Sequence, residues 1–165
     1  MIKMETSMGD IVIELDFEKA PKSAENFQQY VEEGFYDGLI FHRVIGNFMV
    51  QGGGMDENMQ EKATRESIEN EANNGLKNDC YTLAMARTMD PHSASSQFFI
   101  NVKDNGFLNF SSETPQGWGY AVFGKVVKGT EIVDEIKGVA TGRSGFHDDV
   151  PVEPVFINKA TVIED

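Results

Sequence analysis

The residues of this chain that could do chemistry gather in two short stretches, FHRVIGNFMVQGGG at 41–54 and SQFFI at 96–100. Arg43 stands among apolar neighbours in the first stretch, in surroundings that ordinarily disfavour a charge. Two carboxamides, Gln51 and Gln97, lie close in sequence to aromatic and sulfur-containing side chains. These residue types supply no nucleophile, general base or metal ligand set. What they can supply is hydrogen bonding to a neutral ligand beside an apolar surface.

Two interpretations of Arg43 compete. It is either a structural residue, whose stem covers apolar surface or whose charge pairs with a carboxylate, or a cation that holds a neutral ligand by its carbonyl oxygen. Side chains two residues apart in a strand share a face. Met49 and Gln51 therefore share one face, and Gln97 and Phe99 share another. If these faces converge, they form a small apolar cup with one guanidinium and two carboxamides.

Other chemistries fit the sequence less well. Asp90 and His92 lie with several serines in one turn-rich loop, whereas a hydrolytic triad needs members that converge from separate elements beside an oxyanion hole. The remaining histidines, His42 and His147, are remote in sequence and form no pair at metal-ligand spacing. The glycines at 52–54 lack the Lys-Ser/Thr of a phosphate-binding loop. We therefore expect no hydrolase activity, no metal site and no cofactor.

The elements that must position the cup are mostly short strands. Alternating apolar residues predict a hairpin near the start of the chain, turning at Gly9. Polar residues 55–78 indicate a long surface excursion, and residues 141–145 a glycine-rich turn. Further strands are expected at 39–45, 48–51, 68–71, 81–86, 97–102, 121–127 and 155–162.

Two helices interrupt the strands. Pro21 opens an amphipathic helix that Gly34 closes, and Thr130 is expected to cap a second, shorter helix that ends before Gly138. About eight strands joined by hairpin-type connections, without regular βα alternation, predict a closed antiparallel sheet because closure removes exposed edges. Periodicity alone does not choose a barrel over a sandwich.

The size and charge of the chain indicate its domain number, its partners and its compartment. The 165 residues fit one domain, residues 1–165, and the net charge of −13 reflects 27 acidic against 14 basic residues. Such a chain repels phosphate backbones and anionic lipid, so we expect no nucleic acid and no membrane as partners. The single cysteine agrees with a reducing compartment, and the first residues lack an apolar secretory segment. The expectation is a cytoplasmic monomer.

Six motifs in order, FHR, FMVQGG, NEANNGL, LAMAR, SQFFI and VFGKV, resemble the cyclophilin-type peptidyl-prolyl cis/trans isomerases, most closely the compact bacterial cytoplasmic kind. The resemblance runs from about Gly9 to the C-terminus. It implies a mainly β fold, a closed eight-stranded antiparallel barrel capped by two α-helices. It also implies an enzyme that accelerates rotation about X-Pro bonds in proline-containing segments of unfolded or folding proteins, and so assists their folding.

The same resemblance implies roles for individual residues. Arg43 is the catalytic residue, Gln51 orients its guanidinium, and the backbone near Ala86 and Arg87 pairs with the extended peptide before the proline. The full set of substrate-binding residues that it implies is Phe48, Met49, Gln51, Ala86, Arg87, Gln97, Phe99, Phe107, Leu108 and Tyr120. There are two alternatives to an isomerase. One is a module that binds proline-containing segments without catalysis, and the other is a structural barrel without a ligand.

The chain departs from the best-known eukaryotic members of this family at two positions. Phe107 stands where those have a tryptophan whose indole grips cyclosporin, and Tyr120 where those have a histidine. Trp118 falls in an inserted loop and does not replace the missing indole. Because phenylalanine has no N–H donor, we expect weak cyclosporin binding with isomerase activity retained.

Overall fold

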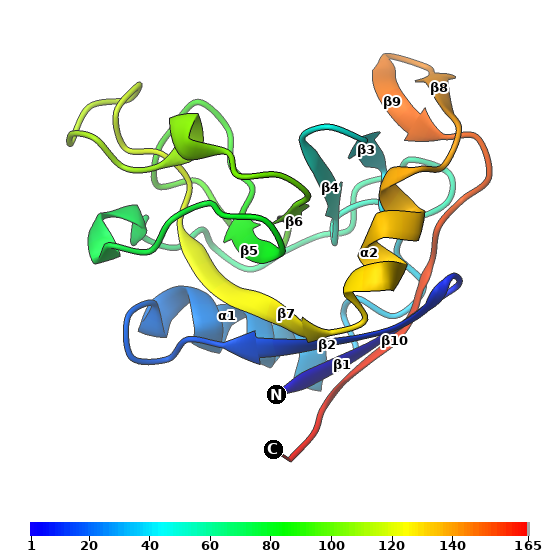
Figure 1. Cartoon of the computed structure of the whole chain (residues 1–165), viewed down its shortest axis with the longest axis horizontal. Helices are drawn as coiled ribbons and strands as arrows, with labels where there is room; N and C mark the ends of the chain where they lie inside the picture. The colour runs from blue at the N-terminus through cyan, green and yellow to red at the C-terminus, as the bar shows by residue number, and fades with distance from the viewer. Residues whose placement is uncertain (165) are drawn as a thin grey trace.

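The computed structural model describes residues 1–164 as one large sheet, a separate hairpin and two α-helices (Figure 1). The strands are β1 (Ile2–Thr6), β2 (Gly9–Leu15), β3 (Arg43–Ile45), β4 (Met49–Gly52), β5 (Thr82–Met85), β6 (Phe98–Asn101), β7 (Val122–Lys128), β8 (Thr141–Ser144), β9 (His147–Pro151) and β10 (Ile157–Val162). The helices are α1 (Pro21–Glu32) and α2 (Thr130–Lys137), and two short 3-10 turns are η1 (Ala72–Asn74) and η2 (Gly106–Leu108).

The large sheet is antiparallel and has the strand order β10-β1-β2-β7-β5-β6-β4-β3. It curls into an open half-barrel, so the predicted closed barrel is wrong. The edge strand β3 has only three residues and forms no ladder with the other edge strand, β10. The chain just before β3 approaches β10 through irregular contacts instead: the Phe41 N–H donates to the Val155 carbonyl at 3.0 Å, and the Ile157 N–H donates to the Leu39 carbonyl at 2.7 Å.

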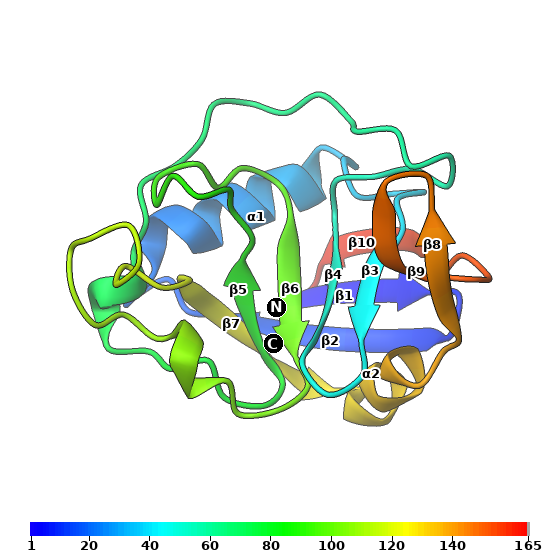
Figure 2. The same ribbon diagram turned by 90° about the horizontal axis from the view of Figure 1, so that it is seen from above.

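The two helices lie at opposite ends of the curled sheet (Figure 2). α1 begins at Pro21, as predicted, and packs on β7 and β10, whereas α2 packs on β2, β3 and β4. The expected cap of α2 is wrong, because Gly129 is the N-cap residue, with φ of +87°, and Thr130 is the first helical residue. A left-handed backbone at this position favours glycine over threonine.

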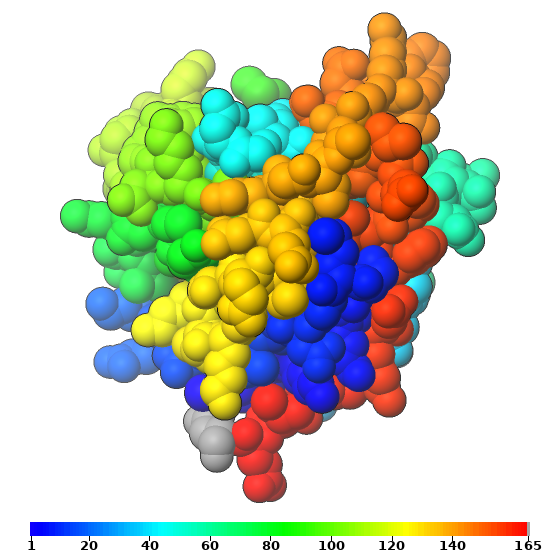
Figure 3. Space-filling model, turned by 45° about the vertical axis from the view of Figure 1, so that its right-hand side comes forward, coloured from blue at the N-terminus to red at the C-terminus, as the bar shows by residue number. Residues whose placement is uncertain are grey.

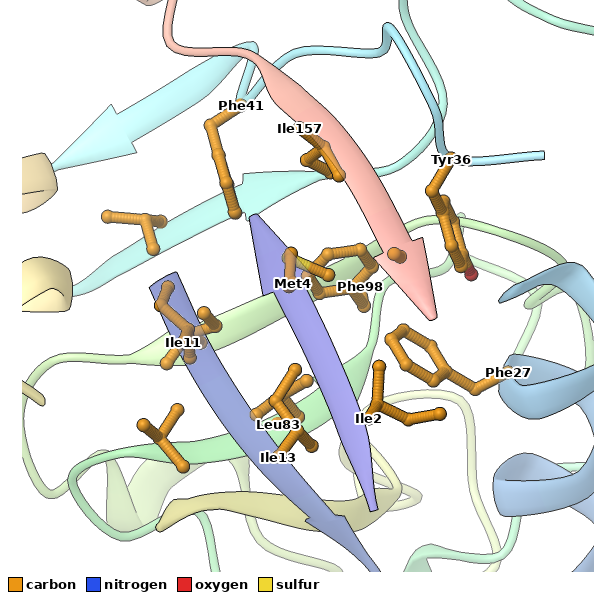
Figure 4. Close-up of a cluster of buried hydrophobic side chains, with 14 of the residues drawn as sticks. Ile2, Met4, Ile11, Ile13, Phe27, Tyr36, Phe41, Leu83, Phe98 and Ile157 are labelled. Carbon is orange, nitrogen blue, oxygen red and sulfur yellow. The ribbon is translucent and has the colours of Figure 1, made fainter. Parts of the chain in front are cut away.

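The core fills the concave side of the sheet (Figure 4). Phe27, from α1, contacts the rings of Tyr36, Phe98 and Phe123 at centroid distances of 5.2–5.3 Å. Each of these four side chains is fully buried, and burial of one such ring stabilises the fold by roughly 1.5–3 kcal/mol. The aromatic cluster therefore fixes the helix against β6 and β7, and β6 carries part of the site described below.

Two stretches differ from the sequence-based expectations. Residues 141–145, predicted as a turn, belong to the hairpin of β8 and β9, which projects from the body of the molecule (Figure 3). Residues 68–71 form no strand, and only an isolated bridge joins Ile68 to Ala94. Within residues 1–164, no helix has both the length and the apolar character needed to cross a membrane.

Close packing explains the glycines at the end of β4. A Cβ atom on Gly53, whose φ is +89°, would lie 2.8 Å from the ring of Phe98 and 2.9 Å from that of Tyr36. A Cβ atom on Gly52 would lie 2.8 Å from the carbonyl oxygen of Ile40. These glycines let the chain pass close to the core.

Candidate active site

Strand register brings the predicted site residues into one row. Arg43 on β3 is paired with Gln51 on β4, Gln51 with Phe99 on β6, and Phe99 with Ala84 on β5. Residues paired directly across antiparallel strands share a face of the sheet. The guanidinium, a carboxamide and an aromatic ring therefore lie side by side, although Arg43 and Phe99 are far apart in sequence.

A cavity of about 330 Å³ lies over this row. Ten of the eleven predicted site residues line it: Arg43, Phe48, Met49, Gln51, Ala86, Arg87, Phe99, Phe107, Leu108 and Tyr120. The exception is Gln97, whose Oε1 accepts a hydrogen bond from Nε2 of Gln51 at 2.9 Å. Gln97 thus supports a wall residue and does not line the cavity itself. The volume lies within the range of small ligand sites.

Arg43 is exposed at the mouth of this cavity. Its guanidinium makes no hydrogen bond or ion pair with any residue in 1–164. The form of the structural interpretation in which a carboxylate pairs with this arginine is therefore wrong. Gln51 faces Arg43 across the strand pair but donates its amide to Gln97, so no hydrogen bond from Gln51 orients the guanidinium here.

The floor and walls of the cavity are apolar. Met49, Phe99 and Leu108 are at least nine-tenths buried and belong to one hydrophobic cluster. Tyr120 meets the Phe99 ring edge-on at 5.6 Å. Phe107, 76 % exposed, stacks on Phe48 at 5.6 Å and forms the rim. A small apolar ring that enters the cavity would leave water and contact apolar and aromatic side chains.

Three buried asparagines hold these walls in place. Asn101 Nδ2 donates to Asn78 Oδ1 at 3.0 Å, and Asn105 Nδ2 donates to Asn101 Oδ1 at 2.8 Å. Asn105 also donates to the Phe48 carbonyl at 2.8 Å. Asn78 donates to the carbonyls of Leu108 and Tyr120 at 3.2 Å each. The network thus fixes the backbone of three wall residues.

Sequence reasoning missed this network. Asparagine is common in turns and exposed loops, and residues 78, 101 and 105 show no pattern that marks them as buried partners. The available signal is weak: Asn101 is a polar residue at the end of the apolar run QFFIN. Burial of that run would demand a hydrogen-bond partner for the amide.

His42, next to Arg43 in sequence, is buried on the opposite side of the chain. Burial lowers its pKa from 6.5 to about 4, and the charges of His147 and Arg43 act in the same direction. Its Nδ1 atom has no hydrogen-bond partner among the residues that the structure describes. The imidazole is therefore neutral at neutral pH and is not part of the cavity.

The loop with Asp90 and His92 does not form a triad. Nδ1 of His92 accepts a hydrogen bond from the Asn70 N–H at 3.0 Å, and the Ser93 hydroxyl donates to the carbonyl of Asp90 at 2.6 Å. Trp118 packs edge-on against His92 at 5.0 Å, outside the cavity. Over residues 1–164, no group of three His, Cys, Asp or Glu side chains could hold a metal ion.

The sheet is an antiparallel half-barrel that carries an apolar cup with the Arg43 guanidinium at its mouth. Residues 1–162 match the family model described as cyclophilin type peptidyl-prolyl cis-trans isomerase/CLD. The chain belongs to this family.

Curated relatives and solved structures agree. Peptidyl-prolyl cis-trans isomerase B of Escherichia coli (strain K12) is 62 % identical, over 99 % of this chain and 100 % of that protein. Peptidyl-prolyl cis-trans isomerase cyp18 of Streptomyces antibioticus is 61 % identical, over 98 % of each. A cyclophilin-type isomerase from Cryptosporidium parvum, solved in the presence of the dipeptide Ala-Pro, has a TM-score of 0.79 at 26 % identity and covers 99 % of both chains. The protein is a peptidyl-prolyl cis/trans isomerase of the bacterial cyclophilin kind.

Proposed function

We propose that Arg43 is the catalytic residue of this isomerase and that the cavity beside it holds the proline of the substrate. The observation that carries the proposal is the unpaired guanidinium at the mouth of an apolar cup of about 330 Å³. A guanidinium keeps its charge at physiological pH and donates several hydrogen bonds in a fixed geometry. It can therefore act on a neutral amide without any proton transfer.

Rotation about an X-Pro bond is slow because the nitrogen lone pair is delocalised into the carbonyl, which sets a barrier of about 18–20 kcal/mol. In the twisted transition state, the nitrogen regains its lone pair. Met49, Phe99 and Leu108 hold the proline ring, while Arg43 donates to the prolyl carbonyl oxygen and presents a donor toward the nitrogen. Interactions that strengthen only in the twisted form lower the barrier.

The required rate enhancement is modest. Uncatalysed isomerisation takes about 10–100 s. A shift to milliseconds is a factor of about 10⁴ to 10⁵, or roughly 5.5–7 kcal/mol. A few hydrogen bonds made in a partly dry cup are sufficient for this.

The backbone beside the cup offers a place for the rest of the peptide. The Ala86 N–H donates to the Gln97 carbonyl at 3.0 Å. The Ala86 carbonyl and the Arg87 N–H have no such bond within the described residues. An extended peptide can pair with these two groups as an added strand. Because the Cryptosporidium parvum isomerase was solved in the presence of Ala-Pro, that structure supports proline-containing segments as the substrate class.

Arg43→Ala tests the assignment. We expect kcat/KM on a short X-Pro peptide to fall by a factor of about 10² to 10³, because an interaction that strengthens in the transition state is lost. The melting temperature should stay within about 2 °C, because Arg43 is exposed and unpaired. Arg143→Ala, which removes an exposed arginine on β8, is the matched control and should keep full activity. If Arg43→Ala retains turnover, the site is a binding surface and catalysis lies elsewhere.

Several wider properties belong to the same proposal. We infer that the chain acts as one domain over residues 1–165, as a monomer in the cytoplasm, on folding proteins, and that cyclosporin binds weakly. The lone cysteine supports a reducing compartment. Light scattering and cell fractionation test the oligomeric state and the location.

A further inference from the structure

The four arginines of this chain fall into two classes. Arg65 pairs with Glu33, and Arg143 lies 4.0 Å from Asp148. The other two are Arg43 and Arg87, which both line the cavity. Neither has a carboxylate within ion-pair distance in the described part of the chain.

This lack of pairing is unusual in an acidic protein. The chain has 27 acidic residues against 14 basic ones, yet none of the ten residues that line the cavity is acidic. Acids in neighbouring segments have other partners: Glu69 pairs with Lys22 at 2.9 Å, and Asp90 Oδ1 accepts the His92 N–H at 2.9 Å. The cup is thus a local positive region on a negative molecule.

Arg87 is held in a fixed position. Its guanidinium lies over the Tyr120 ring, 4.5 Å from the centroid. Nε donates to the Gly119 carbonyl at 3.0 Å, and Nη1 donates to the Thr88 carbonyl at 2.9 Å. Nη2 has no partner among residues 1–164. The guanidinium is thus already held in place, and its Nη2 atom is free to donate. It can bind a carboxylate with little further loss of side-chain freedom.

The two cations reach the cup from different places along the sheet. The row from Arg43 to Ala84 crosses four paired strands, or about 14 Å at roughly 4.8 Å per step, and Arg87 follows three residues after Ala84. In the proposed function, the open backbone groups of Ala86 and Arg87 pair with the residues that precede the proline. The Arg87 side chain starts from that same backbone, so it lies beside these residues of the peptide.

We propose that Arg87 is a specificity-determining residue that selects peptides with Asp or Glu at one of the two positions before the proline. The inference rests on the proposed function, because it takes the position of the peptide from the proposed pairing with Ala86 and Arg87. An ion pair at a partly exposed site changes a binding or rate constant by only a few fold, so the effect is a preference and not an absolute requirement. Salt weakens it, because the Debye length shortens from about 10 Å at 0.1 M to 3 Å at 1 M.

The experiment compares peptides that differ only in charge. Glu, Gln and Lys are placed in turn at each of the two positions before proline, and kcat/KM is measured by NMR exchange, which avoids a coupling protease with its own preferences. At low salt, we expect Glu to exceed Gln by about threefold or more at one of the two positions, and Lys to fall below Gln. At 0.5 M NaCl, the ratio should approach one.

Variants assign the preference to Arg87. Arg87→Gln should bring the Glu-to-Gln ratio close to one, Arg87→Lys should keep part of it, and Arg87→Glu should favour Lys over Gln. Lys128→Gln, at the end of β7 and outside the cavity, is the control and should keep the wild-type ratio. Circular dichroism checks that each variant is folded.

Several outcomes overturn the inference. They are a wild-type ratio near one at both positions, a ratio that persists at high salt, or a ratio that Arg87→Gln leaves unchanged. The wild-type salt series gives an answer even if a variant does not fold. Activity on every peptide without a charge preference rejects only this inference, whereas no activity on any peptide rejects the proposed function.

Discussion

His42 has an unusual environment for an ionisable side chain, since it is buried with an unpartnered Nδ1. Its pKa is about 4 in the folded protein and 6.5 in the unfolded chain. Below pH 6.5, the unfolded chain binds a proton that the folded protein does not, so stability falls as the pH drops from 6.5 to 4 and is unaffected above 6.5. The full effect of this histidine is at most about 3–4 kcal/mol.

Denaturant unfolding of wild type and His42→Phe between pH 7 and pH 4 measures this effect. We expect the wild type to lose more stability than the variant over this interval, because only the wild type has the titrating imidazole. Carboxylates titrate in both proteins, so the difference between the two curves isolates His42. Parallel curves would contradict the expectation.

The expectation of weak cyclosporin binding rests on Phe107, which has no N–H donor. Phe107→Trp adds an indole N–H at the exposed rim, and one new hydrogen bond is worth about 0.5–1.5 kcal/mol. We expect cyclosporin affinity, measured by calorimetry, to rise by up to about tenfold. Phe17→Trp, at an exposed position outside the cavity, is the control and should not change affinity. Nanomolar binding by the wild type would refute the premise.

Single residues of the site could be predicted well, but their hydrogen bonds could not. Arg43, Met49 and Phe99 share the cavity as expected, because strand alternation and family motifs both place them. The hydrogen bond between Gln51 and Gln97 was not foreseen. An amide can reach several partners, and only the register of β4 against β6 decides among them.

At the level of the elements, the asparagine network joins β4, β6 and η2. Asn101→Ala removes an amide that is fully buried, leaves Asn78 Oδ1 without its donor, and leaves Asn105 Nδ2 with only the Phe48 carbonyl as acceptor. We expect a loss of about 1–3 kcal/mol in the free energy of unfolding, because a buried polar group that loses its partner costs about that much. Asn158→Ala, in an exposed position of β10, should cost less than about 1 kcal/mol. If chemical denaturation shows that the two variants lose the same free energy of unfolding, the network does not stabilise the fold.

The same change should impair catalysis. The network fixes the backbone of Phe48, Leu108 and Tyr120, and small displacements of binding groups can lower rates strongly. Asn101→Ala should therefore reduce kcat/KM at temperatures where the variant is still folded. Asn158→Ala should not.

Most elements could be predicted from their apolar pattern, and the exceptions have physical reasons. The hairpin of β8 and β9 escaped prediction because every residue of β8 is exposed, so no alternation marks it. The barrel was expected to close because eight strands with hairpin connections favour closure. The short β3 and the irregular chain at 39–41 prevent closure. The hydrophobic pattern of the sequence predicts neither the length of β3 nor the irregular backbone before it.

For the whole molecule, the net charge of −13 is the dominant electrostatic property. Self-repulsion destabilises a compact state, and salt screens it. We expect the melting temperature at pH 7.5 to rise by roughly 2–4 °C between low salt and 0.5 M NaCl, equivalent to about 1 kcal/mol. Calorimetry at pH 4.6, near the sequence pI of 4.6, is the control and should show no such rise. A fall at pH 7.5 would mean that attractive pairs outweigh the repulsion.

The first and last described strands, β1 and β10, pair with each other, and the Ile163 N–H donates to the Met1 carbonyl at 2.9 Å. Met1 and Ile163 therefore lie side by side, away from the turn between β3 and β4 (Figure 1). A solid support, a fluorescent label or a fused domain attached at either end would leave the mouth of the cavity accessible. A short peptide bridge could also join the two ends into a ring without crossing that mouth.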